Sequence, residues 1–94
     1  MVFSTSDLRK ALERKGFRKI EGGSHTKFVL EVNGVLQSVW TIVSHSKYDI
    51  SYGLQSTVAR ELRMPNPAYL RHFVECSVSA EEYSTMLRDK GMVG

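Results

Sequence analysis

Apolar residues near the start of the chain recur at the spacing of a helix. Leu8, Ala11 and Leu12 lie at positions i, i+3 and i+4, which places them on one side of a helix. Ser6 is a typical N-cap residue, and Gly16 can take the left-handed conformation that commonly ends a helix. The pattern therefore predicts a helix of about ten residues between them.

Three strands are expected to follow this helix. Residues 17–21 alternate in part between apolar and polar positions, and Gly22-Gly23 ends the run. Residues 25–32 and 35–44 form the second and third strands. Asn33-Gly34 between them is the strongest short signal for a two-residue hairpin turn, so these two strands should pair antiparallel.

The expected turn also fixes which residues lie opposite one another. Because side chains alternate along a strand, one face of the hairpin would be apolar and would pack in the core. This face carries Phe28, Leu30, Val32, Val35, Val39 and Val43. The other face would place His25 opposite Ile42 and Lys27 opposite Trp40.

The rest of the chain predicts three helices. Residues 52–63 carry an apolar stripe at helical spacing, and Asn66-Pro67 is a typical start for a second helix. Ser79 and Glu82 have the spacing of a capping box, which would start a third helix. The expected fold is therefore α+β. One helix precedes a three-stranded antiparallel sheet in the sequence, one helix follows it, and two short C-terminal helices come last.

Length and composition fit one small domain spanning residues 1–94, since 94 residues leave no room for two independent cores. No apolar run reaches the roughly 18–20 residues that span a membrane, so no membrane association is expected. The single cysteine, Cys76, cannot form an internal disulfide, which favours the reducing environment of the cytoplasm.

Positive charge is concentrated at the start of the chain. The net charge is +3, but residues 1–27 hold seven Lys or Arg against three Asp or Glu, a local excess of four. Such a bias is typical of proteins that bind a polyanion such as RNA. A solvated helix surface with surplus lysines is the alternative interpretation.

Two of the three histidines are expected at the same end of the sheet. His25 begins the second strand and His45 follows the third, and these ends are neighbours in an antiparallel pair. Lys27 and Lys47 lie close to them in sequence. His72, within a predicted helix and off its apolar stripe, is expected to be an exposed residue without a special role.

This combination could support RNA cleavage. An imidazole titrates near neutrality, so it can take the proton of a 2′-hydroxyl or protonate the leaving 5′-oxygen. Lysine ammonium groups and the backbone N–H groups of Gly22-Gly23-Ser24 could stabilise the charged phosphorane, and Trp40 could stack on an unpaired base. A plain turn, a surface histidine and a packed tryptophan are the alternative interpretations.

Neither a metal nor a nucleotide cofactor is expected. The histidines and Cys76 do not have the spacing of a zinc site, and no phosphate-binding glycine motif is present.

The ordered motifs resemble those of the HicA toxin family. The resemblance rests on residues 6–17, on Gly23-Ser24-His25, on the strand that ends in residues 41–45, and on residues 49–54. It covers roughly the first two thirds of the chain, so residues 1–64 would be the HicA-like core and residues 65–94 a helical extension.

This resemblance implies a fold like that of a double-stranded-RNA-binding domain and a metal-independent mRNA endonuclease. His25 would then be catalytic, and His45 is a candidate second proton carrier. The partners would be mRNA and a HicB-type antitoxin. The expected RNA-binding residues are Gly23, Ser24, Lys27, Trp40, Lys47, Lys10 and Arg14. An RNA-binding domain that does not cleave, or a protein-interaction module, remains an alternative function.

Overall fold

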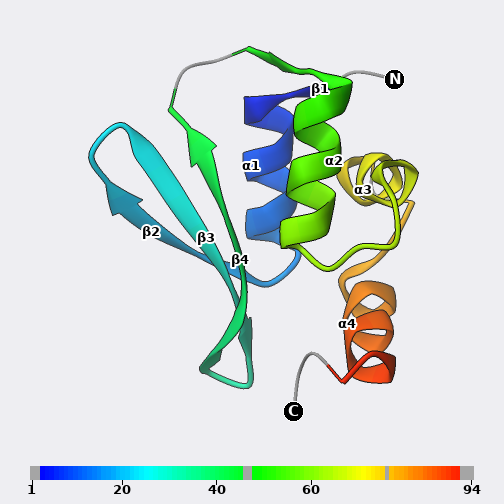
Figure 1. Ribbon diagram of the computed structural model, residues 1–94. Helices are drawn as coiled ribbons and strands as arrows, with labels where there is room; N and C mark the ends of the chain where they lie inside the picture. Colours follow the sequence, from blue (N-terminus) through cyan, green and yellow to red (C-terminus); the bar gives the residue numbers. More distant parts are fainter. Residues whose placement is uncertain (1–2, 46–47, 76, 92–94) are drawn as a thin grey trace.

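The computed structural model describes residues 3–45, 48–75 and 77–91, which form an α+β fold with four helices and a three-stranded antiparallel sheet. In the view of Figure 1 the sheet lies to the left of α1 and α2, and α3 and α4 lie to their right. The elements are β1 (Phe3–Ser4), α1 (Thr5–Arg14), β2 (Phe17–Gly22), β3 (His25–Val32), β4 (Val35–Ser44), β5 (Asp49–Ile50), α2 (Tyr52–Glu61), α3 (Pro67–Val74) and α4 (Ala80–Asp89).

The first helix begins earlier than the sequence pattern predicted. Ser4, and not Ser6, is the N-cap, and its hydroxyl accepts a hydrogen bond from the Asp7 N–H while the Asp7 carboxylate accepts one from the Ser4 N–H. Because this reciprocal pair satisfies two exposed N–H groups, it outcompetes a cap at Ser6. The helix ends as predicted, with Gly16 in the left-handed conformation at a φ of 95°.

The hairpin turn was predicted correctly, but the register is not constant along the hairpin. Asn33 and Gly34 both have positive φ, and Glu31 lies opposite Leu36 as expected. A bulge follows, after which Val29 lies opposite Trp40. Three residues of β4 then face a single residue of β3, so the register shifts by two positions.

The predicted partners of the two site residues on β3 are therefore wrong. His25 lies opposite Ser44 instead of Ile42, and Lys27 lies opposite Ile42 instead of Trp40. The faces are unaffected, because a shift of two residues preserves the alternation of side chains, whereas a shift of one would invert it.

The inner face of the sheet packs against the helices, as the alternation predicted. Phe28, Leu30, Val39 and Val43 are buried on it. Val35, which was expected in the core, is 61% exposed, because it directly follows the turn at the tip of the hairpin. None of the four described helices covers the outer face of the sheet (Figure 1).

A second, two-stranded sheet was not predicted. β1 pairs antiparallel with β5, so that Phe3 lies opposite Ile50, and the Thr5 N–H donates to the Tyr48 carbonyl at 2.9 Å. Strands of two residues have no alternation that a sequence pattern could reveal. This pairing holds the start of α1 beside the segment that follows β4.

The later helices begin where their caps predicted. The Asn66 side chain accepts from the Tyr69 N–H at 2.8 Å, and the Ser79 hydroxyl accepts from the Glu82 N–H at 3.1 Å. The second helix, α2, ends at Glu61 and not at Arg63, because Arg63 takes a left-handed conformation with a φ of 61°.

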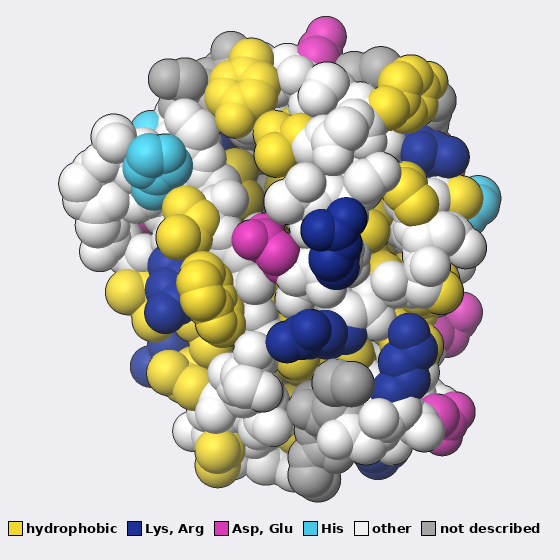
Figure 2. Space-filling view, in the orientation of Figure 1, with side chains coloured by type: hydrophobic (Ala, Val, Ile, Leu, Met, Phe, Trp, Pro, Cys, Tyr) yellow, Lys and Arg dark blue, Asp and Glu magenta, His cyan; other side chains and the backbone are white. Residues whose placement is uncertain are grey.

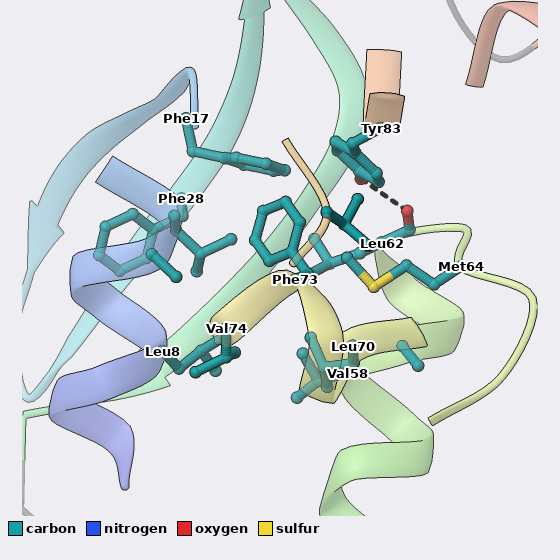
Figure 3. Packing of buried hydrophobic residues seen from close by; sticks show 14 of the residues in the cluster. Leu8, Phe17, Phe28, Val58, Leu62, Met64, Leu70, Phe73, Val74 and Tyr83 are labelled. Carbon is teal, nitrogen blue, oxygen red and sulfur yellow. Dashed lines mark hydrogen bonds between the residues drawn. The ribbon is translucent and has the colours of Figure 1, made fainter. Parts of the chain in front are cut away.

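The two C-terminal helices belong to the same hydrophobic core as the sheet. The Tyr83 ring stacks on Phe17 and meets Phe73 edge-on, at centroid distances of 5.9 and 5.2 Å. The Tyr83 hydroxyl also donates to the Leu62 carbonyl at 2.7 Å, as Figure 3 shows. Residues 65–94 therefore contribute side chains to the centre of the structure and do not form a separate appendage.

Replacing Tyr83 by Phe should lower the thermal stability. The substitution removes the donor to the buried Leu62 carbonyl but keeps the ring, so the cost should be about 1–2 kcal/mol, or about 5–10 °C in melting temperature. Thermal unfolding monitored by circular dichroism measures this shift. Tyr48→Phe is the control, because the Tyr48 ring is exposed, and an equal loss in both variants would contradict the role of the buried hydroxyl.

Stability should also fall at alkaline pH through Tyr83. Burial, together with the neighbouring Tyr69, raises the pKa of the Tyr83 phenol far above its ordinary value. The unfolded chain therefore loses this proton as pH rises above about 10 while the folded chain keeps it, which favours unfolding. Urea unfolding at increasing pH should show the stability difference between wild type and Tyr83→Phe shrinking above about pH 10. A constant difference would contradict this linkage.

Candidate active site

His25 is an exposed residue at one end of the sheet. As the first residue of β3 it pairs with Gly22 on one side and Ser44 on the other, so the backbone on both sides holds it. Its Nδ1 is hydrogen-bonded to the Ser24 hydroxyl at 3.1 Å. Its Nε2 has no hydrogen-bond partner among the described residues. The ring is therefore oriented at one nitrogen and available at the other.

The turn before His25 presents backbone donors. Gly23 has a φ of 52°, which favours glycine, although a Cβ at this position would meet no atom within 4 Å. The N–H groups of Gly23 and Ser24 have no acceptor within the part of the chain that the structure describes. Two adjacent unpaired N–H groups can bind an anion, as the sequence predicted for this stretch.

One cation lies at this end of the sheet, and a second lies farther along its outer face. The Arg9 guanidinium of α1 donates through Nη1 to the Ser44 carbonyl at 2.6 Å, which places it at the residue paired with His25. Lys27 is two residues after His25 on the same face, and its Nζ lies 4.4 Å from the centre of the Trp40 ring. The Arg9 charge would favour a phosphate at this end of the sheet, whereas the Lys27 ammonium lies toward Trp40, which pairs with Val29 farther along β3.

His45 belongs to a chain of hydrogen bonds that the sequence did not reveal. Its Nε2 lies 2.7 Å from the Thr26 hydroxyl, and that hydroxyl donates to the Glu21 carboxylate at 2.9 Å. A hydroxyl has one proton, and the carboxylate can only accept, so the Thr26 oxygen must accept from His45. The proton of the neutral His45 ring is therefore on Nε2, and Nδ1 is the nitrogen that can take a further proton.

The two histidine rings point to opposite sides of the sheet. The His45 N–H donates to the Ser24 carbonyl at 3.1 Å, so the backbones are neighbours as expected. His45 nevertheless reaches Thr26, which points to the inner face, and consecutive residues of a strand alternate between faces. His25 points to the outer face. The prediction of two neighbouring histidines therefore holds for the backbones but not for the direction of the rings.

A small cavity lies next to His25. Its volume is about 230 Å³, and His25, Ile42, Ser44, Tyr48 and Leu54 contribute to its lining. The cavity connects the end of the sheet with the first turn of α2. A group bound at His25 would therefore have an apolar wall beside it.

The remaining predicted site residues are dispersed. Trp40 is on the outer face, on the same side of the sheet as His25 and Lys27, and is 39% exposed. Lys10 is exposed on α1. Arg14 is at the other end of α1, where it borders a different cavity together with Gly16 and Glu31. Lys47 lies outside the described residues.

Three residues of this site were missed by sequence reasoning: Arg9, Glu21 and Thr26. Arg9 was counted only within the basic helix, and Glu21 only within a strand. Thr26 lies on the same face of its strand as Phe28 and Leu30, so its hydroxyl gave no signal of a polar contact. Each contact depends on which residues the fold places opposite one another. His72 is exposed on α3, as predicted.

No group of three or more His, Cys, Asp or Glu side chains in the described ranges could hold a metal ion. None of the helices within those ranges is long and apolar enough to cross a membrane. Comparisons with models of protein families, with curated proteins and with solved structures gave no match for this chain.

Removing the Thr26 hydroxyl should release the His45 ring. In the wild type the Nε2 proton of His45 is bonded to Thr26, so Thr26→Val should speed its exchange with solvent about tenfold, while Thr26→Ser should retain the slow rate. Nitrogen-detected NMR of the ring measures both the site of the proton and its exchange. A proton on Nδ1 in the wild type, or equal exchange in the Val and Ser variants, would contradict the assignment.

Proposed function

We propose that this protein is a metal-independent RNA endonuclease with His25 as its principal acid–base residue. The observation that carries the proposal is the position of the His25 ring. One nitrogen is oriented by Ser24 and the other is open to solvent, two unpaired N–H groups precede the residue, and the Arg9 guanidinium lies at its paired residue, Ser44. This arrangement supplies the parts that cleavage through the 2′-hydroxyl requires.

The chemistry needs two proton transfers and no metal. The 2′-oxygen loses its proton and bonds to phosphorus, and the bond from phosphorus to the 5′-oxygen breaks as that oxygen gains a proton. The products are a 2′,3′-cyclic phosphate and a 5′-hydroxyl. Nε2 of His25 would take the proton of the 2′-hydroxyl and return it to the 5′-oxygen, because the ring of His45, the predicted second proton carrier, points to the opposite side of the sheet. Arg9 and the turn N–H groups would stabilise the charge on the phosphorane, and Lys27 would hold the RNA backbone farther along the sheet.

The order of elements supports a relation to the HicA toxins. The helix, three antiparallel strands and helix from α1 to α2 agree with the order expected for a fold like that of a double-stranded-RNA-binding domain. The partner would then be a HicB-type antitoxin that covers His25. The uncovered outer face, with Ile20, Leu36 and Ile42 exposed, offers an apolar surface for such a protein.

Replacing His25 by Ala should abolish cleavage. We expect the rate on a single-stranded RNA in EDTA to fall by about 10²–10⁴-fold, because a general acid–base group is lost. Fold should be kept, since the His25 side chain is exposed. Gel analysis of end-labelled RNA measures both the rate and the cyclic phosphate ends.

His72→Ala is the matched control, because it removes an exposed histidine on α3. It should cleave like the wild type. Equal cleavage by the His25 and His72 variants, or cleavage that stops in EDTA, would contradict the proposed mechanism.

A second candidate is an RNA-binding domain that does not cleave. It is favoured by one observation, that the rings of His25 and His45 point to opposite sides of the sheet. A second proton carrier would then be missing on the outer face. This alternative predicts salt-dependent RNA binding without new RNA ends.

A further inference from the structure

A second concave site lies on the molecule, away from the turn before His25. It has a volume of about 230 Å³ and is lined by Ser38 and Trp40 of β4 and by Arg60, Glu61 and Arg63 at the end of α2. Figure 2 shows one face of the molecule, in the orientation of Figure 1. Lys and Arg side chains gather near the middle of the view, beside hydrophobic side chains over the sheet. None of the residues around His25 contributes to this pocket.

The two arginines of the pocket are available to an anion. Both are exposed, and neither guanidinium has an ion pair or hydrogen bond with the described residues. Glu61 lies between them in sequence, but its carboxylate accepts a hydrogen bond from the buried Thr41 hydroxyl at 2.8 Å. Glu61 is exposed and also lines the pocket, but it forms no ion pair with either arginine, so the pocket keeps a net excess of one positive charge.

Arg63 occupies a position where another residue type would be favoured. It follows the C-cap of α2 and has a φ of 61°, a conformation that glycine or asparagine adopts most readily. The Met64 N–H donates to the Ala59 carbonyl at 2.8 Å and the Arg63 N–H to the Arg60 carbonyl at 3.1 Å, so this conformation ends α2. It also sets the point at which the Arg63 side chain leaves α2 and borders the pocket.

Trp40 supplies a flat surface beside these charges. Its ring is partly exposed, and the Lys27 Nζ lies over it at 4.4 Å from the centroid. A nucleobase stacked on an indole gains more than an exposed cation–π contact does, so a base can displace the ammonium. Lys27 would then be free to contact a phosphate. An aromatic surface among cations is the recurring arrangement for unpaired nucleotides.

We propose that this pocket binds one nucleotide of a single-stranded RNA, with the base on Trp40 and a flanking phosphate on Arg60 and Arg63. The identity of the ligand rests on the proposed function. Trp40 is four residues along β4 from Ser44, the partner of His25, which corresponds to about 13 Å. The pocket therefore holds a nucleotide outside the scissile bond, on the same face as His25, and determines where along the strand the RNA is cut.

Trp40 itself is a reporter for this site, because it is the only tryptophan in the chain. We would titrate the His25→Ala protein with a short oligouridine and follow tryptophan fluorescence. Saturable quenching is expected. In the Arg60→Gln/Arg63→Gln double variant the affinity for oligouridine should fall about 10–100-fold. The slope of log affinity against log salt concentration should also become shallower, by the amount that corresponds to the loss of roughly one to two phosphate contacts.

The control is the Arg18→Gln/Arg88→Gln double variant, which loses the same charge elsewhere. Arg18 is paired with Glu31 on the sheet, and Arg88 borders a different cavity. The Arg18→Gln/Arg88→Gln variant should bind the oligouridine nearly as tightly as the His25→Ala parent protein does. Equal losses in the two double variants, quenching by inorganic phosphate alone at the same concentration, or equal quenching by double-stranded RNA would overturn the proposal.

The outcomes for the two proposals can be told apart. Binding is measured in the His25→Ala protein and does not require cleavage. A protein that binds oligouridine at Trp40 but never cuts RNA would refute the nuclease and leave this site in place. A protein that cuts RNA at unchanged positions and rates after Arg60→Gln/Arg63→Gln and Trp40→Leu would refute this site and leave the nuclease in place.

Discussion

The buried ammonium of Lys15 is the contact on which the arrangement of the helices depends. Lys15 is the C-cap of α1, and its Nζ donates to the carbonyl oxygens of Phe73 and Val78 while lying 4.5 Å from the centre of the Phe73 ring. A buried cation is tolerated only when hydrogen bonds replace its water. The end of α1 is thereby fixed to α3 and to the segment before α4, and α1 in turn covers the inner face of the sheet that positions His25.

The features that could be predicted from the sequence are those determined by neighbouring residues. Asn33-Gly34 determined the hairpin turn, and Gly16 determined the end of α1, because the turn needs a left-handed backbone at two successive residues and the helix end needs it at one. The bulge opposite Leu30 and the pairing of β1 with β5 depend on residues far apart in sequence. No local pattern could therefore have predicted either of them.

The same distinction applies to the candidate site. His25 stood out because a glycine-rich turn and a strand meet there. Thr26 gave no signal, because a threonine among apolar residues in a strand looks like ordinary core, and its role appears only when Glu21 and His45 are placed beside it. The direction of the His45 ring, in contrast, follows from strand alternation that is the same in the predicted and the observed register, so it could have been inferred from the position of His45 two residues after Val43.

The position of Tyr83 and Leu87 in the core has a consequence for how the protein is made. The ribosome completes α1, the sheet and α2 before it synthesises α4, at roughly 5–20 residues per second. For roughly one to five seconds the nascent chain therefore has the His25 turn but lacks the side chains that close the core beside Phe17. The core that supports the sheet is therefore completed only after synthesis has passed Leu87.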